Sequence, residues 1–119
     1  RAFVLCFPIQ KLKQNMLQFF KNILGGGESP DYAALVKAGA VIVDVRTKAE
    51  YQSGHIKGSL NIPVNELANN LSKLPKSKTI ITCCASGMRS SSAKGILESK
   101  GYEQVYNGGA WSSLQRHLN

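Results

Sequence analysis

The fold is decided by residues 79–90, which read TIITCCASGMRS. The first five residues, all β-branched apart from Cys83, predict a strand that is buried on both faces of a parallel sheet. Small residues follow at positions 85–87 and predict a tight loop, after which residues 90–100 predict a helix that ends at Gly101. In open α/β sheets a strand–loop–helix unit of this kind lies at the carboxyl edge, where ligands bind.

The rest of the sequence from residue 31 onwards repeats this alternation of strands and helices. Further strands are predicted at residues 41–45, 59–63 and 104–106. Helices are predicted at residues 32–36, between Thr47 and Gly54, and at residues 65–73 and 111–118, with a turn at residues 107–109. The pattern predicts an α/β fold with a central, mostly parallel sheet flanked by helices on both faces.

The first thirty residues differ from the rest, and predict an N-terminal extension (residues 1–30) in front of a domain at residues 31–119. In residues 12–24 apolar side chains recur at three-to-four spacing with lysines and glutamines between them, which predicts an amphipathic helix. We expect this helix to dock on the domain or on a protein partner rather than on a membrane.

The composition excludes several classes of protein. The chain has 119 residues, of which 43% are hydrophobic and 18% charged, and this balance indicates a globular domain rather than a disordered chain. No apolar run reaches the ~18–20 residues that span a bilayer, so we expect no transmembrane segment. The formal net charge is +8, but the lysines are spread along the chain. This distribution indicates a solvated basic surface, or one that attracts small anions, and no nucleic-acid partner.

The cysteines argue against a structural role in crosslinking or metal binding. There are three of them, Cys6 and the adjacent pair Cys83 and Cys84. This arrangement is neither a disulfide framework nor the paired spacing of a zinc site, so we expect no metal. A reducing, cytoplasmic location is the simpler expectation.

The loop after Cys84 has the features that activate a thiol. Backbone N–H groups of successive small residues can converge on an anion, the following helix adds a partial positive charge, and Arg89 adds a full one. Lowering a cysteine pKa from about 8.5 to about 6.5 needs only ~2.7 kcal/mol, which these groups can supply. An inert buried cysteine is the alternative, and the spacing of Cys84, Gly87 and Arg89 argues against it.

This loop belongs to a series of motifs that resembles a known family. The motifs are Asp44-Val45-Arg46, Glu50-Tyr51, Gly54-His55-Ile56, Asn61-Ile62-Pro63, the loop of residues 84–90, and Gly108-Gly109. In order and spacing the series is similar to the single-domain rhodaneses over residues 31–119. The resemblance implies a rhodanese-like fold.

The resemblance also implies sulfur transfer, with a small anionic sulfur donor and a thiol acceptor as partners. Cys84 would take the outer sulfur of thiosulfate, or that of a persulfide donor, hold it as a persulfide and pass it to cyanide or a thiol. Arg89 would neutralise the sulfonate end of the donor. The substrate would also be bound by the backbone of the loop residues Ala85, Ser86, Gly87 and Met88. No metal or organic cofactor is implied.

The adjacent cysteines raise a question of register. Counted from Cys84 the loop is Cys-x4-Arg, as in sulfurtransferases, and counted from Cys83 it is Cys-x5-Arg, as in the related dual-specificity phosphatases. The position of Gly87 and the ending Arg89-Ser90 favour Cys84. Cys83 then occupies the last strand position, and its side chain points to the opposite face of the sheet from that of Cys84. We expect it to be a packing residue, with a resolving thiol as the other reading.

Residues outside the loop are expected to support the site. Asp44 and Arg46 lie on one face of their strand and predict a structural network, in which Arg46 pairs with Glu50 and Asp44 accepts hydrogen bonds near the loop. His55 is expected to be a hydrogen-bonded structural residue. Two other functions remain open: a persulfide carrier or interaction module that does not turn over and docks through residues 12–24, and a phosphatase that uses Cys83.

Overall fold

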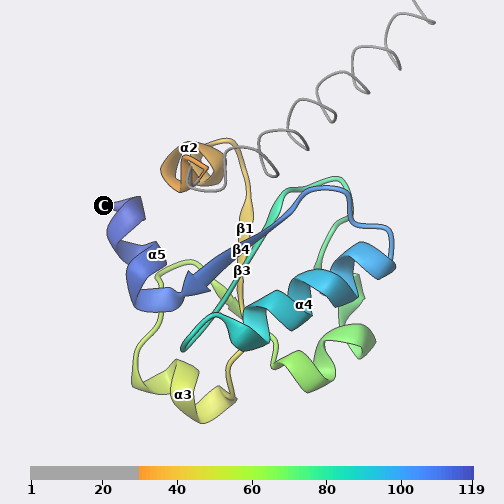
Figure 1. The fold of residues 1–119 in the computed structure, drawn as a ribbon, viewed down its shortest axis with the longest axis horizontal. Helices are drawn as coiled ribbons and strands as arrows, with labels where there is room; N and C mark the ends of the chain where they lie inside the picture. The colour runs from red at the N-terminus through yellow and green to blue at the C-terminus, as the bar shows by residue number, and fades with distance from the viewer. Residues whose placement is uncertain (1–29) are drawn as a thin grey trace, which may run out of the picture. The chain divides into compact units, whose positions relative to one another are not determined.

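The computed structural model describes residues 30–119 (Figure 1). The amphipathic helix predicted at residues 12–24 and the rest of the N-terminal extension lie outside the described residues. The predicted division of the chain at residue 30 therefore stays a prediction.

A four-stranded sheet, parallel at every pairing, forms the centre of the described residues. Its order is β2-β1-β3-β4, with β1 at Val41–Asp44, β2 at Leu60–Asn61, β3 at Ile80–Cys84 and β4 at Val105–Ala110. The β-branched runs form the two central strands, and all of β3 is buried because helices cover both faces of the sheet there. The predicted parallel α/β sheet is confirmed.

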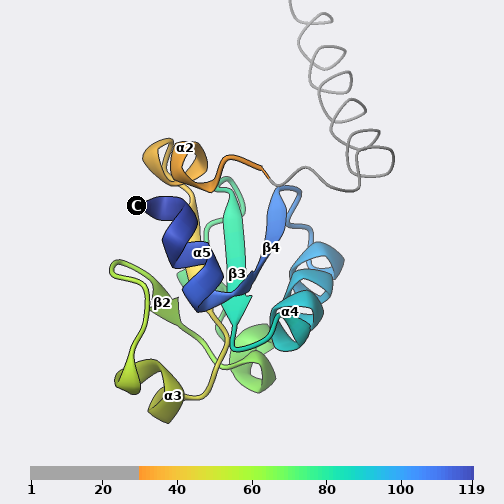
Figure 2. The same cartoon turned by 60° about the vertical axis from the view of Figure 1, so that its left-hand side comes forward.

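Helices cover the two faces of this sheet. The α-helices are α2 (Tyr32–Lys37), α4 (Met88–Ser99) and α5 (Trp111–Leu118), with α3 (Lys48–Ser53) beyond the ends of the strands (Figures 1 and 2), and the 3-10 helices are η1 (Val64–Asn69) and η2 (Leu71–Lys73). The views in Figures 1 and 2 show α4 on one side of the strands and α2 with α5 on the other. Thr47 and Glu50 form the capping box that begins α3, because each side chain accepts from the other residue's backbone N–H.

The hydrophobic core consists of two clusters of buried residues, and successive side chains of β3 belong to different clusters. Ile80 and Cys84 belong to the cluster under α4, whereas Ile81 and Cys83 belong to the cluster that includes Leu114 of α5. Neighbouring side chains of a strand point to opposite faces, so the adjacent cysteines are separated by the sheet itself.

Strand β4 is longer than the sequence predicts. Residues 107–109 were expected to form a turn, but β4 runs on to Ala110, so this prediction is wrong. The reason is Gly108, where a Cβ would lie 2.9 Å from both Leu114 Cδ2 and the Thr82 carbonyl oxygen. Without a side chain the backbone approaches β3 closely, and a shift in register between Thr82 and Cys84 accommodates the extra length.

Two other boundaries also differ from the predictions. The helix expected at residues 65–73 is a pair of 3-10 helices, η1 and η2, separated at Asn70. Asn69 and Asn70 are poor formers of α-helix, which explains the break. Helix α4 begins at Met88, two residues early, because Gly87 adopts φ of +102° and starts the helix directly after the loop.

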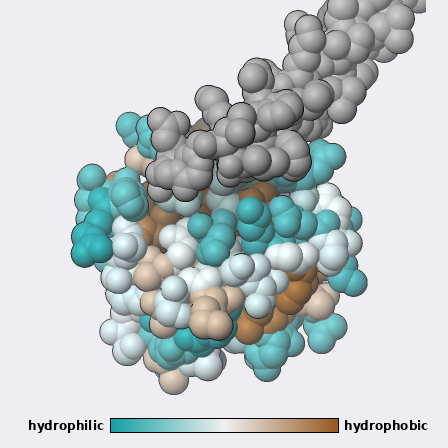
Figure 3. Space-filling model, in the orientation of Figure 1, coloured by the Kyte–Doolittle hydropathy of each residue, from teal (hydrophilic) through white to brown (hydrophobic). Residues whose placement is uncertain are grey.

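The surface in Figure 3 is mostly hydrophilic or neutral, with small hydrophobic patches. Large hydrophobic side chains that are exposed include Val36, Leu60 and Met88. Within residues 30–119 we find no helix with the length and apolar character needed to cross a bilayer.

Candidate active site

Cys84 is the last residue of β3, and its side chain is fully buried at the start of the loop. Its Sγ accepts a hydrogen bond from the Gly87 N–H at 2.9 Å and one from the Ser90 N–H at 3.4 Å. The Ser90 hydroxyl oxygen lies 3.5 Å from the same sulfur. The loop therefore folds around this single atom, as its small residues predict.

These hydrogen bonds change the acidity of the Cys84 thiol. Burial by itself raises its pKa, but hydrogen bonds from the Ser90 side chain and from the backbone of Ser90, Gly87 and Ser86 outweigh burial, and the pKa is lowered. Hydrogen bonds to a sulfur favour its thiolate form. Cys84 is thus the more acidic of the two adjacent cysteines.

Cys83 has the opposite environment on the other face of β3. Burial, together with the charge of Asp44, raises the pKa of Cys83 to about 12, and the charge of Arg46 opposes this only in part. Its side chain is fully buried in the core cluster next to α5. The prediction that Cys83 is a packing residue is confirmed.

Arg89 forms an ion pair that the sequence analysis did not predict. Its Nη1 lies 2.7 Å from Glu50 Oε1, and its Nη2 donates to Oε2 at 3.1 Å. The hydrogen bonds from Arg89 and Thr47 lower the pKa of Glu50 to about 2. Both side chains are more than a third exposed, so solvent can reach the pair.

Arg46 pairs with Asp44 and not with Glu50, so the predicted pairing is wrong. The guanidinium donates from Nε to Asp44 Oδ1 at 2.9 Å and from Nη2 to Oδ2 at 2.7 Å. The Glu50 side chain is turned towards Arg89, and Arg46 reaches only the Glu50 carbonyl oxygen, at 3.3 Å. A residue two positions away on the same strand face is a nearer partner than a side chain on the next helix.

The same guanidinium connects three elements of the fold. It donates to the Gly54 carbonyl oxygen at the end of α3, at 2.7 Å, and lies 4.7 Å from the centre of the Trp111 ring at the start of α5. Asp44 and Arg46 are both buried. Through the hydrogen bond to Gly54, the Asp44–Arg46 pair positions α3, and with it Glu50, beside the loop.

The remaining predicted residues lie at the edge of the site. His55 Nδ1 lies 2.7 Å from the Tyr51 carbonyl oxygen and the His55 ring stacks on the Tyr51 ring, as expected of a structural residue. Ala85 and Ser86 are exposed and Gly87 is half-buried. Met88 is 78% exposed and extends into solvent next to Arg89.

One residue close to the site was missed by the sequence analysis. Asn107 of β4 accepts a hydrogen bond from the Ser90 hydroxyl at 2.6 Å. The only signal in the sequence is its place directly before Gly108-Gly109, which was interpreted as a turn.

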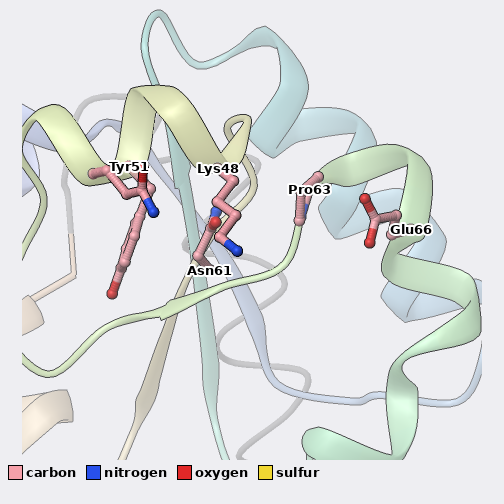
Figure 4. Close-up of a pocket in the computed structure, with 6 residues that line it drawn as sticks. Lys48, Tyr51, Asn61, Pro63 and Glu66 are labelled. Carbon is pink, nitrogen blue, oxygen red and sulfur yellow. The ribbon is translucent and has the colours of Figure 1, made fainter.

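A cavity among the described residues lies away from this loop. Its volume is about 430 Å³, and its lining comes from α3, β2 and η1: Lys48, Tyr51, Gln52, Asn61, Pro63 and Glu66 (Figure 4). None of the loop residues lines it, so the chemistry of Cys84 does not take place there. Within the described part of the chain, no three His, Cys, Asp or Glu side chains are grouped so that they could hold a metal ion.

The arrangement of a strand-end cysteine, a short loop and an arginine in a parallel sheet can be compared with known proteins. A family model described as a rhodanese-like domain matches residues 29–113. The chain belongs to the rhodanese-like domain family.

Relatives within the rhodanese family support this at the level of sequence. Thiosulfate sulfurtransferase PspE of Escherichia coli (strain K12) is 36% identical over 74 residues, which cover 60% of this chain and 71% of PspE. Thiosulfate sulfurtransferase GlpE of Pseudomonas savastanoi is 35% identical over 74 residues, which cover 62% of this chain and 70% of that protein.

The solved structures agree with the sequence comparison. A rhodanese with anions from E. coli matches with a TM-score of 0.60 at 32% identity, over 63% of this chain and 91% of that chain. The rhodanese fold and the enzyme class predicted from the sequence, a rhodanese-type sulfurtransferase, are confirmed.

Proposed function

We propose that this rhodanese transfers sulfane sulfur through a persulfide on Cys84. The donor is thiosulfate or a persulfide, and the acceptor is a thiophile such as cyanide or a thiol. The observation that carries the proposal is the set of hydrogen bonds to the Cys84 sulfur, from the Ser90 side chain and from backbone N–H groups, which lower the pKa of this thiol. The names of the relatives PspE and GlpE support thiosulfate as a donor.

The two steps are balanced displacements at sulfur. The Cys84 thiolate attacks the outer sulfur of thiosulfate, a new S–S bond forms, and sulfite leaves with the electron pair of the broken bond. The acceptor then attacks the outer sulfur of the persulfide, and Cys84 leaves as a thiolate. Neither step needs a metal or an organic cofactor.

Arg89 is the group that we assign to the anionic end of the donor. It is always charged, and its planar guanidinium suits the oxygens of a sulfonate. Glu50 occupies both terminal nitrogens of this guanidinium, so the donor has to share or displace the Glu50 carboxylate. A solved relative described as a rhodanese with anions supports an anion site in this fold.

The substrate is also bound, we propose, by the backbone of residues 85–88, while Asp44, Arg46 and His55 support the site without touching it. A nucleophile that cycles between thiolate and persulfide suits a reducing compartment, so we propose a cytoplasmic location. A protein partner that docks through residues 12–24 remains part of the proposal.

The alternative functions predict different chemistry. A phosphatase that uses Cys83 is disfavoured, because this thiol is buried on the far face of β3 with its pKa raised to about 12. A carrier that does not turn over would accept one sulfur on Cys84 from a protein donor and would produce no thiocyanate.

The experiment compares the wild-type chain with Cys84→Ser and the matched variant Cys83→Ser. Each protein is incubated with thiosulfate and cyanide, and thiocyanate is measured. We expect Cys84→Ser to lose all turnover and Cys83→Ser to keep it. Intact mass after thiosulfate alone should show one added sulfur, located on Cys84 by peptide mapping. Full thiocyanate production by Cys84→Ser would overturn the proposal.

A further inference from the structure

The hydrogen bonds of Ser90 leave one question open, namely where its single hydroxyl hydrogen points. Its oxygen lies 3.5 Å from Cys84 Sγ, 2.6 Å from Asn107 Oδ1 and 3.0 Å from the Gly87 carbonyl oxygen. A hydroxyl donates only once, so these three acceptors compete for one hydrogen.

The amide of Asn107 settles this question for the thiol form. Asn107 Oδ1 also accepts from the Gly109 N–H at 2.9 Å, and Nδ2 lies 3.4 Å from the Gly87 carbonyl oxygen. A backbone N–H can only donate, so the atom that faces both Gly109 and Ser90 is the amide oxygen. Ser90 must therefore donate to Asn107 at the short distance of 2.6 Å, and its oxygen lone pairs face the Cys84 S–H.

The thiolate form requires a different arrangement. A thiolate has no hydrogen to donate, and two lone-pair-bearing atoms, Ser90 Oγ and Cys84 Sγ, would then face each other 3.5 Å apart. Rotation of the Ser90 hydroxyl towards the sulfur gives the thiolate a hydrogen bond, in which the sulfur is a charged acceptor. The rotation costs the hydrogen bond to Asn107, because Ser90 Oγ and Asn107 Oδ1, 2.6 Å apart, then have no hydrogen between them and have to separate. Asn107 Oδ1 keeps the Gly109 N–H in both arrangements, so the rotation leaves the amide oxygen with a partner.

We propose that Asn107 is a positioning residue that controls, through the Ser90 hydroxyl, how readily Cys84 gives up its proton. With the hydrogen on Asn107, the thiol is favoured, and with the hydrogen on the sulfur, the thiolate is favoured. The inference rests on the proposed function, in which Cys84 is a thiolate both when it attacks the donor and when it leaves the persulfide. In the persulfide the charge lies on the outer sulfur, and the hydroxyl returns to Asn107.

The other charged and titratable groups around Cys84 are kept in all the variants below. They are Cys83 on β3, Arg89 on α4 with its partner Glu50 on α3, and the Asp44–Arg46 pair at the end of β1. A change in the acidity of Cys84 in these variants is thus due to Asn107 or Ser90.

The test is a direct titration of Cys84 by the ¹³Cβ chemical shift of labelled cysteine, in the full chain. Asn107→Ala removes one competitor for the hydroxyl hydrogen and should lower the Cys84 pKa by about half a pH unit. Asn107→Asp keeps both hydrogen bonds of Oδ1, holds the hydrogen more firmly and should raise the pKa. Ser90→Ala removes the donor to the sulfur and should also raise it.

The same Asn107 variants in a Ser90→Ala background show whether Asn107 acts on the Cys84 pKa through the Ser90 hydroxyl, which we call the relay, or through a general disturbance of the loop. Asn107→Ala should then have no effect, and Asn107→Asp should keep only the smaller effect of its charge. Equal shifts in both backgrounds, or a raised pKa in Asn107→Ala, would overturn the proposal. If Asn107→Ala does not fold, the Cys84 pKa of Asn107→Asp, compared with and without Ser90→Ala, answers the same question. Asn70→Ala, away from the loop, serves as the unshifted control.

This titration needs neither a sulfur donor nor an acceptor. A relay without thiocyanate production would leave the inference standing and remove the proposed function. Thiocyanate production without coupling between Ser90 and Asn107 would support the proposed function and overturn the inference about Asn107.

Discussion

At the scale of single residues, the two adjacent cysteines show how strongly the local environment changes the pKa of a thiol. The side chains of Cys83 and Cys84 are both fully buried, yet the pKa of Cys83 is raised to about 12 and that of Cys84 is lowered. Burial acts on both in the same direction. The difference comes from hydrogen bonds of the Ser90 side chain and of the loop N–H groups, which reach only Cys84, and from the charge of Asp44, which raises the pKa of Cys83 further.

The first prediction concerns the pH dependence of persulfide formation. The thiolate is the reactive form, and its lowered pKa means that it persists to a lower pH than an ordinary cysteine thiolate. The single-turnover rate with thiosulfate should therefore fall as the pH drops through the lowered pKa, at a lower pH than for an ordinary cysteine. In Ser90→Ala the fall should begin at a higher pH, and an identical profile would contradict the assigned role of the hydrogen bonds.

The second prediction concerns the charge that faces the donor. Glu50→Gln keeps an oxygen that can accept from the Thr47 N–H, but it removes the negative charge paired with Arg89. The KM for thiosulfate should fall roughly two- to fivefold, because the contribution of a solvent-exposed ion pair is small. Glu66→Gln makes the same change in charge without an ion pair to Arg89 and should leave KM unchanged. A rise in KM for Glu50→Gln would show that Glu50 orients Arg89 rather than competing for it.

At the scale of elements, the site depends on how closely β4 approaches β3. Gly108 brings the backbone of β4 against Thr82 and Leu114, and this places Asn107 beside Ser90 at the start of α4. The left-handed conformation of Gly87 starts α4 directly after the loop. Two glycines in different elements therefore shape the surroundings of one sulfur.

The third prediction compares two glycines by their surroundings. Gly108→Ala places a Cβ 2.9 Å from Leu114 Cδ2 and from the Thr82 carbonyl oxygen, and should destabilise the fold by about 1–3 kcal/mol. Gly95→Ala, within α4, meets no atom within 4 Å and should stabilise it by about 0.5–1 kcal/mol. Urea unfolding measures both. Equal effects of the two substitutions would mean that β4 does not approach β3 as described.

At the scale of the whole domain, the buried pair of Asp44 and Arg46 connects β1 with the end of α3 and the start of α5. The carboxyl ends of the parallel strands meet at one edge of the sheet, and Asp44 lies opposite Cys83 in the register of β1 with β3. A single ionic contact thus joins the elements that surround the loop. The loss of either partner would leave the other as an unpaired charge in the core.

The fourth prediction tests this connection. Arg46→Met leaves the Asp44 carboxylate buried without its partner and should cost about 3–5 kcal/mol of the free energy of unfolding. The double variant Asp44→Asn with Arg46→Met removes both charges and should recover a large part of this loss. Urea unfolding of the single and double variants gives the coupling between the two residues. Additive losses would contradict the paired arrangement.

The parts of this protein that depend on local pattern can be predicted from the amino-acid sequence. The β-branched runs specified the central strands, Thr47 and Glu50 specified the start of α3, and the loop after Cys84 specified the family. These features arise from residues near one another in the chain, whose propensities and hydrogen bonds do not require the rest of the fold.

Contacts between side chains that are distant in the sequence depend on the three-dimensional fold. Arg89 pairs with Glu50 across 39 positions, and Ser90 donates to Asn107 across 17. The fold also turned the expected glycine turn into the end of β4, because Gly108 is forced against β3. Such contacts depend on strand register and on the packing of helices over the sheet, which no short stretch of sequence encodes. Each side chain has several possible partners of suitable chemistry, and the folded backbone brings one of them within reach.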